Sequence, residues 1–278
     1  MLPISLVLAS GFFHALWNVC TKKSLHKESF LFAVQLVSFV VLFPIFFHNF
    51  LQINFTPKAC ALLLLSMLAH GFYFVILARL YTIGDLSQTY PIIRGSSLLI
   101  VPLFGVMILH EHLSVLGCLG VAMIIGGIFT IGELKFSLLN RKIFSLSLLV
   151  GLSIATYVVI DRLVIYHVDV LALNQIATLG NILALSPFVL RKKSQNLRQE
   201  IKLNYQSILL GTALAPAFYM IFLTALNMAQ ISTLAPMREI GTVFGAMIGI
   251  FFLKETNAKN RIISSIIITC GVLLLAVN

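Results

Sequence analysis

Long apolar stretches separated by short polar connections follow one another along the whole chain. A helix needs about 20 consecutive apolar residues to cross the hydrocarbon core of a bilayer, because each residue adds only about 1.5 Å of length. Ten stretches meet this requirement, and each is predicted to be a membrane-spanning helix. They lie at residues 2–20, 29–47, 58–79, 87–109, 114–132, 144–165, 169–190, 207–226, 231–253 and 260–277.

The composition favours a membrane protein over a soluble one. Hydrophobic residues make up 59% of the 278 residues and charged residues only 10%, which is too little polar surface for a soluble domain of this length. The longest polar connection is KSQNLRQEIKLNYQ, after Lys192, so no water-soluble domain is expected. Every functional residue should therefore lie within the helices or at their ends.

Basic residues are distributed unevenly over the connections. Those after the first, third, fifth, seventh and ninth helices hold 15 lysines and arginines, the opposite connections hold Lys58 and Arg162, and the termini hold none. Because cytoplasmic loops are enriched in Lys and Arg, we predict cytoplasmic odd-numbered connections and both termini outside, in a bacterial inner membrane. This distribution also explains the net charge of +10 without a nucleic-acid partner.

The fourth and ninth apolar stretches share one pattern of special residues. Each begins with a small-polar segment, LSQTYP (86–91) or ISTLAP (231–236), that ends in a proline. An arginine follows, then a glutamate 17 residues later and a glycine 16 residues beyond that. The first copy is Pro91, Arg94, Glu111 and Gly127, and the second is Pro236, Arg238, Glu255 and Gly271.

A further similarity extends this pattern to whole halves of the chain. GFFHALWNVCTK (11–22) aligns without gaps on GLSIATYVVIDR (151–162). We therefore predict two related halves, residues 1–135 and 143–278, each with five helices. Since five is an odd number, the second half must cross the membrane in the opposite sense, which is the inverted-repeat architecture of alternating-access carriers.

These duplicated features, together with the first-helix motif HALWN (14–18), resemble the drug/metabolite transporter superfamily, specifically its EamA-type branch of ten-helix proteins. The resemblance covers essentially the whole chain. It implies an all-α integral membrane protein with two inverted five-helix repeats around a central cavity lined by the first, third, fourth, sixth, eighth and ninth helices. It also implies a secondary transporter of small metabolites, commonly an exporter of amino acids or similar zwitterionic or anionic compounds.

Arg94 and Arg238 are charged residues inside apolar stretches, where an arginine costs about 2.5–3.5 kcal/mol on insertion scales. One interpretation is that both snorkel to the interface with their stems in lipid. The other is that they face a wet cavity between the halves, one at each mouth, and bind a carboxylate or phosphate. Pro91 and Pro236 disturb the first turn beside them and are candidates for gating.

Glu111 and Glu255 are expected to end the fourth and ninth helices at opposite faces of the membrane. A solvated helix end is the simplest interpretation. A carboxylate at a helix C-terminus opposes the helix dipole, however, so a compensating partner is also expected. We therefore hypothesise a structural latch at the turn into the next helix.

Polar and aromatic residues on other helices complete the candidate cavity wall. His14 and Asn18 are four residues apart and share a helix face with Trp17, although a histidine here fits packing as well as proton transfer. Asp161 is interpreted as a local partner of Arg162 or a snorkelling group. The candidate substrate-binding residues are His14, Trp17, Asn18, His70, Tyr73, Arg94, Tyr157, Tyr219 and Arg238.

Small residues recur in GVAMIIGG (120–127) and SSIIITCG (264–271). Small side chains let helix backbones approach closely, so the fifth and tenth helices are expected to pack tightly, either within a half or at a dimer face.

Two alternative functions also fit the sequence. The first is an importer or uncoupled facilitator of anionic metabolites such as nucleotides. The second is an integral-membrane enzyme, but HExxH, GxSxG and GxxxxGK motifs are absent, and we predict no catalytic residue, metal or cofactor. The expected partners are a small-molecule substrate and the lipid bilayer, with protons and a second copy of the chain as further candidates.

Overall fold

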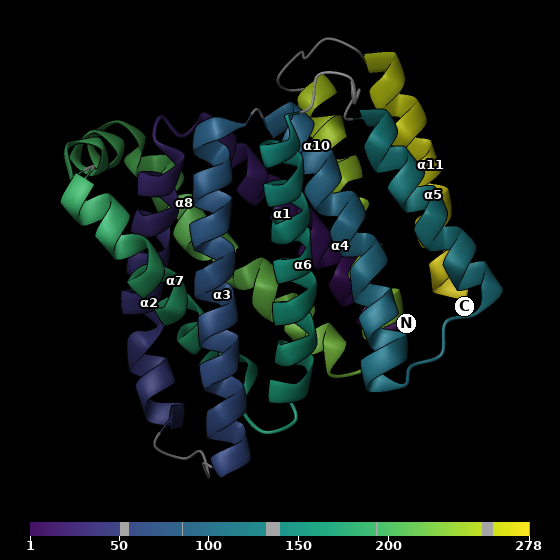
Figure 1. The fold of residues 1–278 in the computed structure, drawn as a ribbon, viewed down its shortest axis with the longest axis horizontal. Helices are drawn as coiled ribbons and strands as arrows, with labels where there is room; N and C mark the ends of the chain where they lie inside the picture. The colour runs from purple at the N-terminus through teal and green to yellow at the C-terminus, as the bar shows by residue number, and fades with distance from the viewer. Residues whose placement is uncertain (51–55, 85, 132–139, 193, 252–257, 278) are drawn as a thin grey trace.

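A computed structural model describes residues 1–50, 56–84, 86–131, 140–192, 194–251 and 258–277, which form helices and no strands (Figure 1). The helices are α1 (Leu2–Lys23), α2 (Lys27–Phe50), α3 (Pro57–Ile83), α4 (Leu86–Leu109), α5 (Val115–Ile131), α6 (Arg141–Val164), α7 (Val170–Lys192), α8 (Ser194–Leu226), α9 (Ile231–Met237), α10 (Ile240–Phe251) and α11 (Ala258–Val277).

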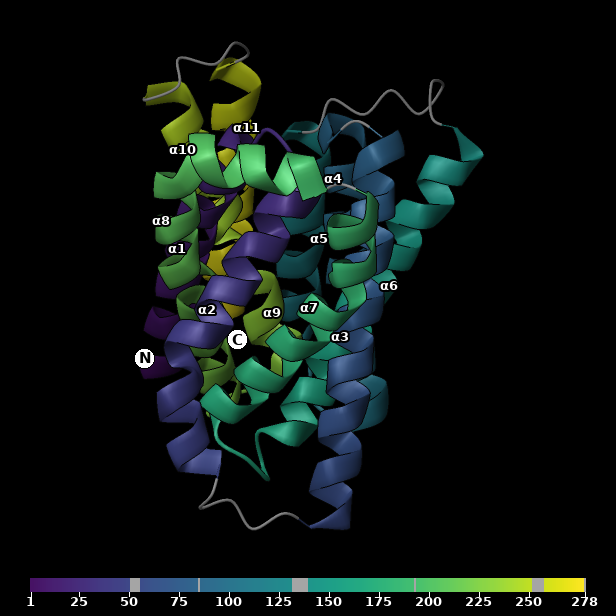
Figure 2. The same cartoon turned by 90° about the vertical axis from the view of Figure 1, so that its left-hand side faces the viewer.

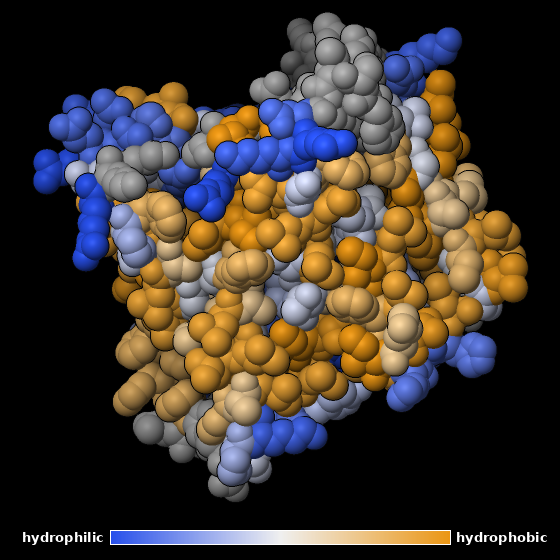
Figure 3. Space-filling model, viewed as in Figure 1, coloured by the Kyte–Doolittle hydropathy of each residue, from blue (hydrophilic) through white to orange (hydrophobic). Residues whose placement is uncertain are grey.

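The bundle has the surface of a membrane protein. Within the described ranges, nine apolar segments are long enough to cross a bilayer, and α5 forms a tenth, shorter apolar helix. A hydrophobic belt covers the middle of the face shown in Figure 3, with hydrophilic side chains at its upper and lower edges. Large side chains such as Leu68, Leu99 and Met107 are exposed within this belt. The predicted ten-span, all-α membrane fold is confirmed.

Helices that occupy equivalent places in the two halves make equivalent contacts. α1 packs on α8 as α6 packs on α3, and α4 packs on α6 as α10 packs on α1. α3 packs on α7 as α8 packs on α2, while α5 pairs with α11 at one side of the bundle (Figure 1). The helices of the two halves are therefore interleaved around a common centre.

Glycine explains the close contact between α5 and α11. A Cβ atom added to Gly271 would lie 2.6 Å from the carbonyl oxygen of Gly120, and one added to Gly120 would lie 2.8 Å from the carbonyl oxygen of Gly271. Only glycine permits this approach without displacement of a backbone. The expected tight packing is present, between α5 and α11 of the same chain.

The ninth span differs from the expected continuous helix over 231–253. It is divided into α9 and α10 at Arg238 and Glu239. Around the break, the Glu239 N–H donates to the Pro236 carbonyl and the Gly241 N–H donates to the Arg238 carbonyl, so the backbone forms tight 3₁₀-type turns. Pro236 lacks an N–H and its ring crowds the preceding turn, which favours such a break. α4 carries Pro91 at the matching place but stays continuous.

The polar stretch after Lys192 was expected to be a connection and is helical instead. α8 begins at Ser194, and Asn204, with φ −121° and ψ 25°, marks a kink within it. The segment before this kink lies across the upper end of the bundle (Figure 2). Its Glu200 is fully buried and accepts hydrogen bonds from the N–H groups of Leu25 (3.3 Å) and His26 (2.7 Å). Glu200 therefore satisfies donors at the start of α2 and ties the two elements together.

Candidate functional site

A cavity of about 160 Å³ lies at the centre of the bundle, among α1 to α4, α6 to α8 and the break between α9 and α10. This volume accommodates several water molecules, since one needs about 10–15 Å³. All nine candidate substrate-binding residues line it: His14, Trp17, Asn18, His70, Tyr73, Arg94, Tyr157, Tyr219 and Arg238. The structure thus brings together residues from six of the predicted spans.

α2 and α7 also line the cavity, which was not expected. Asn174, Thr178 and Asn181 face it from α7, and Gln35 and Ser38 face it from α2. The three α7 residues stand at spacings of four and three, so they form one polar stripe on an apolar helix. That stripe is the signal in the sequence that could have identified this wall.

Arg94 makes two charged or polar contacts inside the bundle. Its Nη1 lies 3.0 Å from Oε1 of Glu239, and its Nη2 lies 3.0 Å from Nε2 of His14. An arginine can only donate hydrogen bonds, so Nε2 of His14 must be the acceptor. His14 is therefore neutral in this arrangement, with its ring proton on Nδ1. This contact leaves His14 poorly suited to the proton transfer considered for it.

The ion pair between Arg94 and Glu239 joins the two halves of the chain. The side chains are only 11% and 6% exposed, and Oε2 of Glu239 also accepts a hydrogen bond from Thr242 at 3.2 Å. The snorkelling interpretation of Arg94 is wrong, because Arg94 lines the central cavity and its guanidinium group bonds to Glu239 and His14.

Arg238 faces the same cavity in a different environment. Its Cζ lies 4.1 Å from the centroid of the Phe222 ring, a cation–π contact, and the residue is 7% exposed. Its Nε has no hydrogen-bond partner among the described residues, and the neighbouring Glu239 pairs with Arg94. The arginines are therefore not placed one at each mouth, because both line one cavity. Among the residues that the structure describes, Arg94 has a carboxylate partner there and Arg238 does not.

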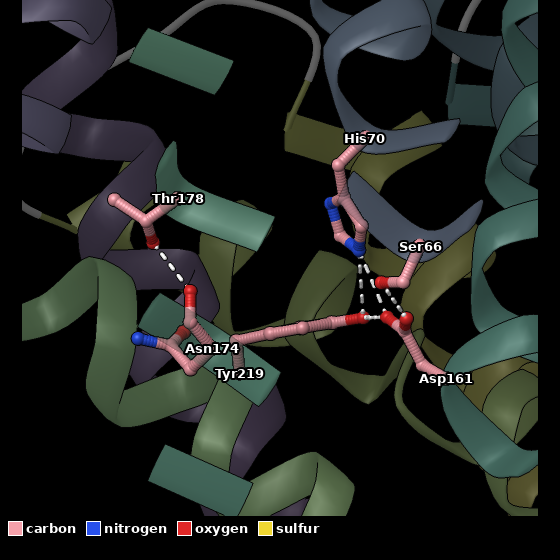
Figure 4. A network of polar contacts seen from close by, with 6 residues as sticks. All are labelled: Ser66, His70, Asp161, Asn174, Thr178 and Tyr219. Carbon is pink, nitrogen blue, oxygen red and sulfur yellow. Dashed lines mark hydrogen bonds and ion pairs between the residues drawn. The ribbon is translucent and has the colours of Figure 1, made fainter. Parts of the chain in front are cut away.

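Asp161 is the centre of a buried polar network (Figure 4). Its Oδ1 accepts a hydrogen bond from the Ser66 hydroxyl at 2.5 Å, and its Oδ2 lies 2.8 Å from Nε2 of His70 and accepts a hydrogen bond from the Tyr219 hydroxyl. The interpretation of Asp161 as a local partner of Arg162 is wrong. Asp161 is fully buried, and Arg162 stacks on the ring of Tyr166.

The network was missed because its members come from three helices. Ser66 and His70 are four residues apart on α3, and Tyr157 and Asp161 are four residues apart on α6. Each pair therefore forms a polar stripe that the sequence displays. The meeting of both stripes with Tyr219 of α8 depends on tertiary packing.

Aromatic rings form the cavity wall beside this network. The ring centroid of Tyr157 lies 4.2 Å from that of His70 and 5.3 Å from that of Tyr73. Phe218 also lines the cavity, and its ring lies 4.9 Å from His14 and 6.5 Å from Trp17, centroid to centroid. Such faces accommodate apolar groups and organic cations.

Two amide side chains of α7 offer unused polar atoms. Asn174 and Asn181 are each 5% exposed, and the Nδ2 of Asn174 and the Oδ1 of Asn181 have no hydrogen-bond partner within the described part of the chain. Buried polar atoms are usually satisfied, so one donor and one acceptor beside the cavity indicate a polar occupant.

Glu111 is neither a solvated end nor a latch to the next helix. Its Oε1 and Oε2 accept hydrogen bonds from the N–H groups of Ile231 (2.9 Å) and Ser232 (2.8 Å) at the start of α9. A carboxylate at a helix N-terminus is stabilised by the helix dipole, which compensates its position after α4. Gly105 leaves room for this contact, because a Cβ there would lie 2.7 Å from Oε2 of Glu111.

The remaining gating candidates have less distinctive surroundings. Pro91 is buried within α4, one turn before Arg94, and Pro236 is buried within α9, just before the helix break. Glu255 lies outside the described residues.

Comparisons with known proteins agree with this architecture. A model of the EamA-like transporter family matches residues 1–132 and 141–277. No curated protein matches the chain. A solved structure described only as "Crystal structure of protein" is similar with a TM-score of 0.79, over 99% of this chain and 97% of that chain, at 10% sequence identity. At this identity, the likeness shows a common fold alone.

Proposed function

The chain belongs to the EamA-like transporter family, and from this premise we propose that it carries a small zwitterionic or anionic metabolite through the central cavity by alternating access. A multi-pass membrane transporter of the drug/metabolite type follows from the family. The chemistry of the substrate is inferred from the cavity, with Arg238 as the group that binds a carboxylate.

The main support for this proposal is that the charge of Arg238 has no carboxylate partner among the described residues. Glu239 balances the charge of Arg94 at 3.0 Å, whereas Arg238 contacts the Phe222 ring and has an unsatisfied Nε. A buried charge without a counter-ion is costly, so an entering carboxylate gains both a charge-assisted hydrogen bond and relief of that cost.

The rest of the wall is complementary to an amino acid. Asn174 offers a free donor that suits a carboxylate oxygen, and Asn181 offers a free acceptor that suits an ammonium group. The rings of Trp17, Tyr73 and Tyr157 can contact either an ammonium group or an apolar side chain. A substrate with both charges and an apolar portion therefore uses all of these groups.

The two halves, residues 1–135 and 143–278, are proposed to be the moving units. Their equivalent helices make equivalent contacts, and the cavity lies between them. An inverted pair of this kind has two related arrangements, one open to each side of the membrane.

Export from a bacterial cytoplasm is the proposed direction. Both termini lie on the right-hand side of the bundle in Figure 1, below its middle. Hydrophilic side chains gather along the upper edge of the face shown in Figure 3. Lys22 and Lys23 end α1, and Arg191 lies near the end of α7. The positive-inside rule then favours a cytoplasmic upper end and extracytoplasmic termini.

Trp17 allows a direct test of the binding site. It is the only tryptophan of the chain and lines the cavity, so its fluorescence reports occupancy. Purified protein is titrated with a panel of amino acids, organic anions and hydrophobic cations, and the compounds that alter the emission are then tested for flux into sealed liposomes. We expect carboxylate compounds to bind and to cross the membrane only where the protein is present.

Arg238→Gln should weaken the binding of these carboxylate compounds at least about tenfold, because a hydrogen bond to a charged group contributes about 1.5–3 kcal/mol. Arg198→Gln is the matched control, since Arg198 is exposed on α8. Unchanged affinity in Arg238→Gln, or binding of hydrophobic cations alone, would contradict the proposal.

A further inference from the structure

The buried carboxylate of Asp161 has no role in the proposed binding of substrate. It is a fully buried carboxylate in the membrane-spanning part of α6, where an ionised group needs compensation. The hydroxyls of Ser66 and Tyr219 donate hydrogen bonds to it but carry no charge. The one side chain bonded to Asp161 that can carry a positive charge is His70, whose Nε2 lies 2.8 Å from Oδ2.

We propose that Asp161 and His70 together form a proton-binding site that couples substrate movement to a proton gradient. This inference rests on the proposed transport function. The site is the carboxylate–imidazole pair with its two hydroxyl donors, and its ligand is a single proton.

The proton has a defined place to bind. In the unloaded pair, a neutral His70 carries its hydrogen on Nε2 and donates it to ionised Asp161. The other ring nitrogen, Nδ1, points away from Asp161 in Figure 4. A hydronium ion in the cavity transfers a proton to the Nδ1 lone pair, one N–H bond forms, and water leaves. The charge of the pair changes from −1 to zero, and release follows the same path in reverse.

The other buried ionisable groups considered for proton binding already have different partners. The other buried acidic side chains among the described residues are Glu200, which caps α2, and Glu239, which pairs with Arg94. His14 has its Nε2 lone pair occupied by the Arg94 guanidinium group. Of these buried carboxylates, Asp161 alone has an ionisable imidazole as its partner.

Within the described ranges, the side chains around the pair are polar and include no second anion. Tyr157 stacks on the His70 ring from α6, Tyr73 lies beside Tyr157 on α3, and Tyr219 faces Asp161 from α8. Asn174 and Thr178 of α7 line the same cavity, lie apart from the pair in Figure 4 and are uncharged. The cations that line the same cavity are Arg94 and Arg238.

The position of the pair explains how a proton affects the carrier. His70 and Ser66 belong to the first half, whereas Asp161 and Tyr219 belong to the second. Loading or unloading the proton therefore changes the attraction between the halves. His70, Tyr157 and Tyr219 also line the cavity, so the substrate and the proton share one wall.

Proton binding is measured first, without any substrate. Full-length protein labelled with ¹⁵N-histidine is titrated from about pH 5 to about pH 9 in detergent, and the His70 ring signals are identified by their absence in His70→Gln. We expect the His70 signals to change with pH in the wild type and to titrate differently in Asp161→Asn. His167→Gln, which removes an exposed histidine after α6, should leave the His70 signals unchanged. His70 signals that stay constant across this range overturn the proposal.

Coupling is measured second, in liposomes that contain the pH dye pyranine. The carboxylate compound of the panel that alters Trp17 emission most is applied as a gradient, and its flux and the internal pH are recorded together. Wild-type protein should move protons with the compound. His70→Gln and Asp161→Asn should reduce the proton flux to the level of protein-free vesicles, and Tyr219→Phe, which removes one hydroxyl only, should shift the pH profile of transport.

The outcomes separate this inference from the proposed function. Transport of the compound with no proton movement in the wild type, or equal proton flux in wild type and Asp161→Asn, overturns the proton site and leaves the transporter proposal intact. If no compound binds or crosses, the substrate proposal fails, and the histidine titration alone decides whether the proton site exists.

Discussion

Replacing Glu239 with glutamine removes the carboxylate that balances Arg94. The two charges are 3.0 Å apart at their nearest atoms and almost completely buried. With an effective dielectric constant of about 20, two unit charges separated by about 3–4 Å attract by about 4–6 kcal/mol. This agrees with the cost of about 3–5 kcal/mol for removing one partner of a buried pair. The single variant should therefore lose about 3–5 kcal/mol of stability.

The double variant Arg94→Gln/Glu239→Gln should lose less than either single variant. Both charges disappear together, and exchange of a whole buried pair for neutral groups is often close to neutral in stability. We expect a coupling energy of about 2 kcal/mol or more in this double-mutant cycle. Such a result would show that the halves are joined by the ion pair as well as by packing.

Thermal unfolding of the purified protein, followed by Trp17 emission, measures these effects. A loss of about 1 kcal/mol lowers the melting temperature by about 2–4 °C in chains of roughly this size, so Glu239→Gln should melt roughly 6–20 °C below the wild type. Arg198→Gln, an exposed arginine, serves as the control. A Glu239→Gln protein that melts within about 2 °C of the wild type, or a double variant as unstable as the sum of its parents, would refute the reasoning.

Three further substitutions test individual contacts. Glu111→Gln should cost about 1–2 kcal/mol in melting experiments, because one of the two N–H donors at the start of α9 loses its acceptor, and an unchanged melting temperature would contradict this capping role. Gly271→Ala should cost about 1–3 kcal/mol by overpacking against α5, whereas Gly126→Ala, which has open space around its Cβ, should be tolerated; equal stability of both would refute the close contact. Glu200→Gln should speed amide hydrogen exchange at the start of α2, and unaltered exchange there would show that another group holds this end.

The fold was largely predictable because the bilayer imposes a simple length rule. The existence and order of the spans follow from apolar stretches of sufficient length. The duplicated proline, arginine and glutamate led to the correct family. The helical start of α8 was missed, because a polar amphipathic segment at the membrane surface has the composition of a loop.

The candidate site was predictable as a set of residue types and not as a set of contacts. Polar groups within apolar helices indicated that His14, Arg94 and Arg238 line a central cavity. Their partners could not be read from the sequence, because Arg94 meets Glu239 and Asp161 meets His70 only through tertiary packing. Adjacent residues suggested the wrong partner for Asp161, since neighbours along a helix point about 100° apart and seldom meet.

The interleaving of the two halves also bears on synthesis. When the ribosome has synthesised the first five helices, α1 still lacks its neighbours α8 and α10, α3 lacks α6 and α7, and α4 lacks α6 and α9. Arg94 then lacks its partner Glu239, which is translated 145 residues later. Until Glu239 is inserted, water or lipid headgroups must solvate the charge of Arg94. The first five helices therefore reach their final packing only after the ninth span is inserted.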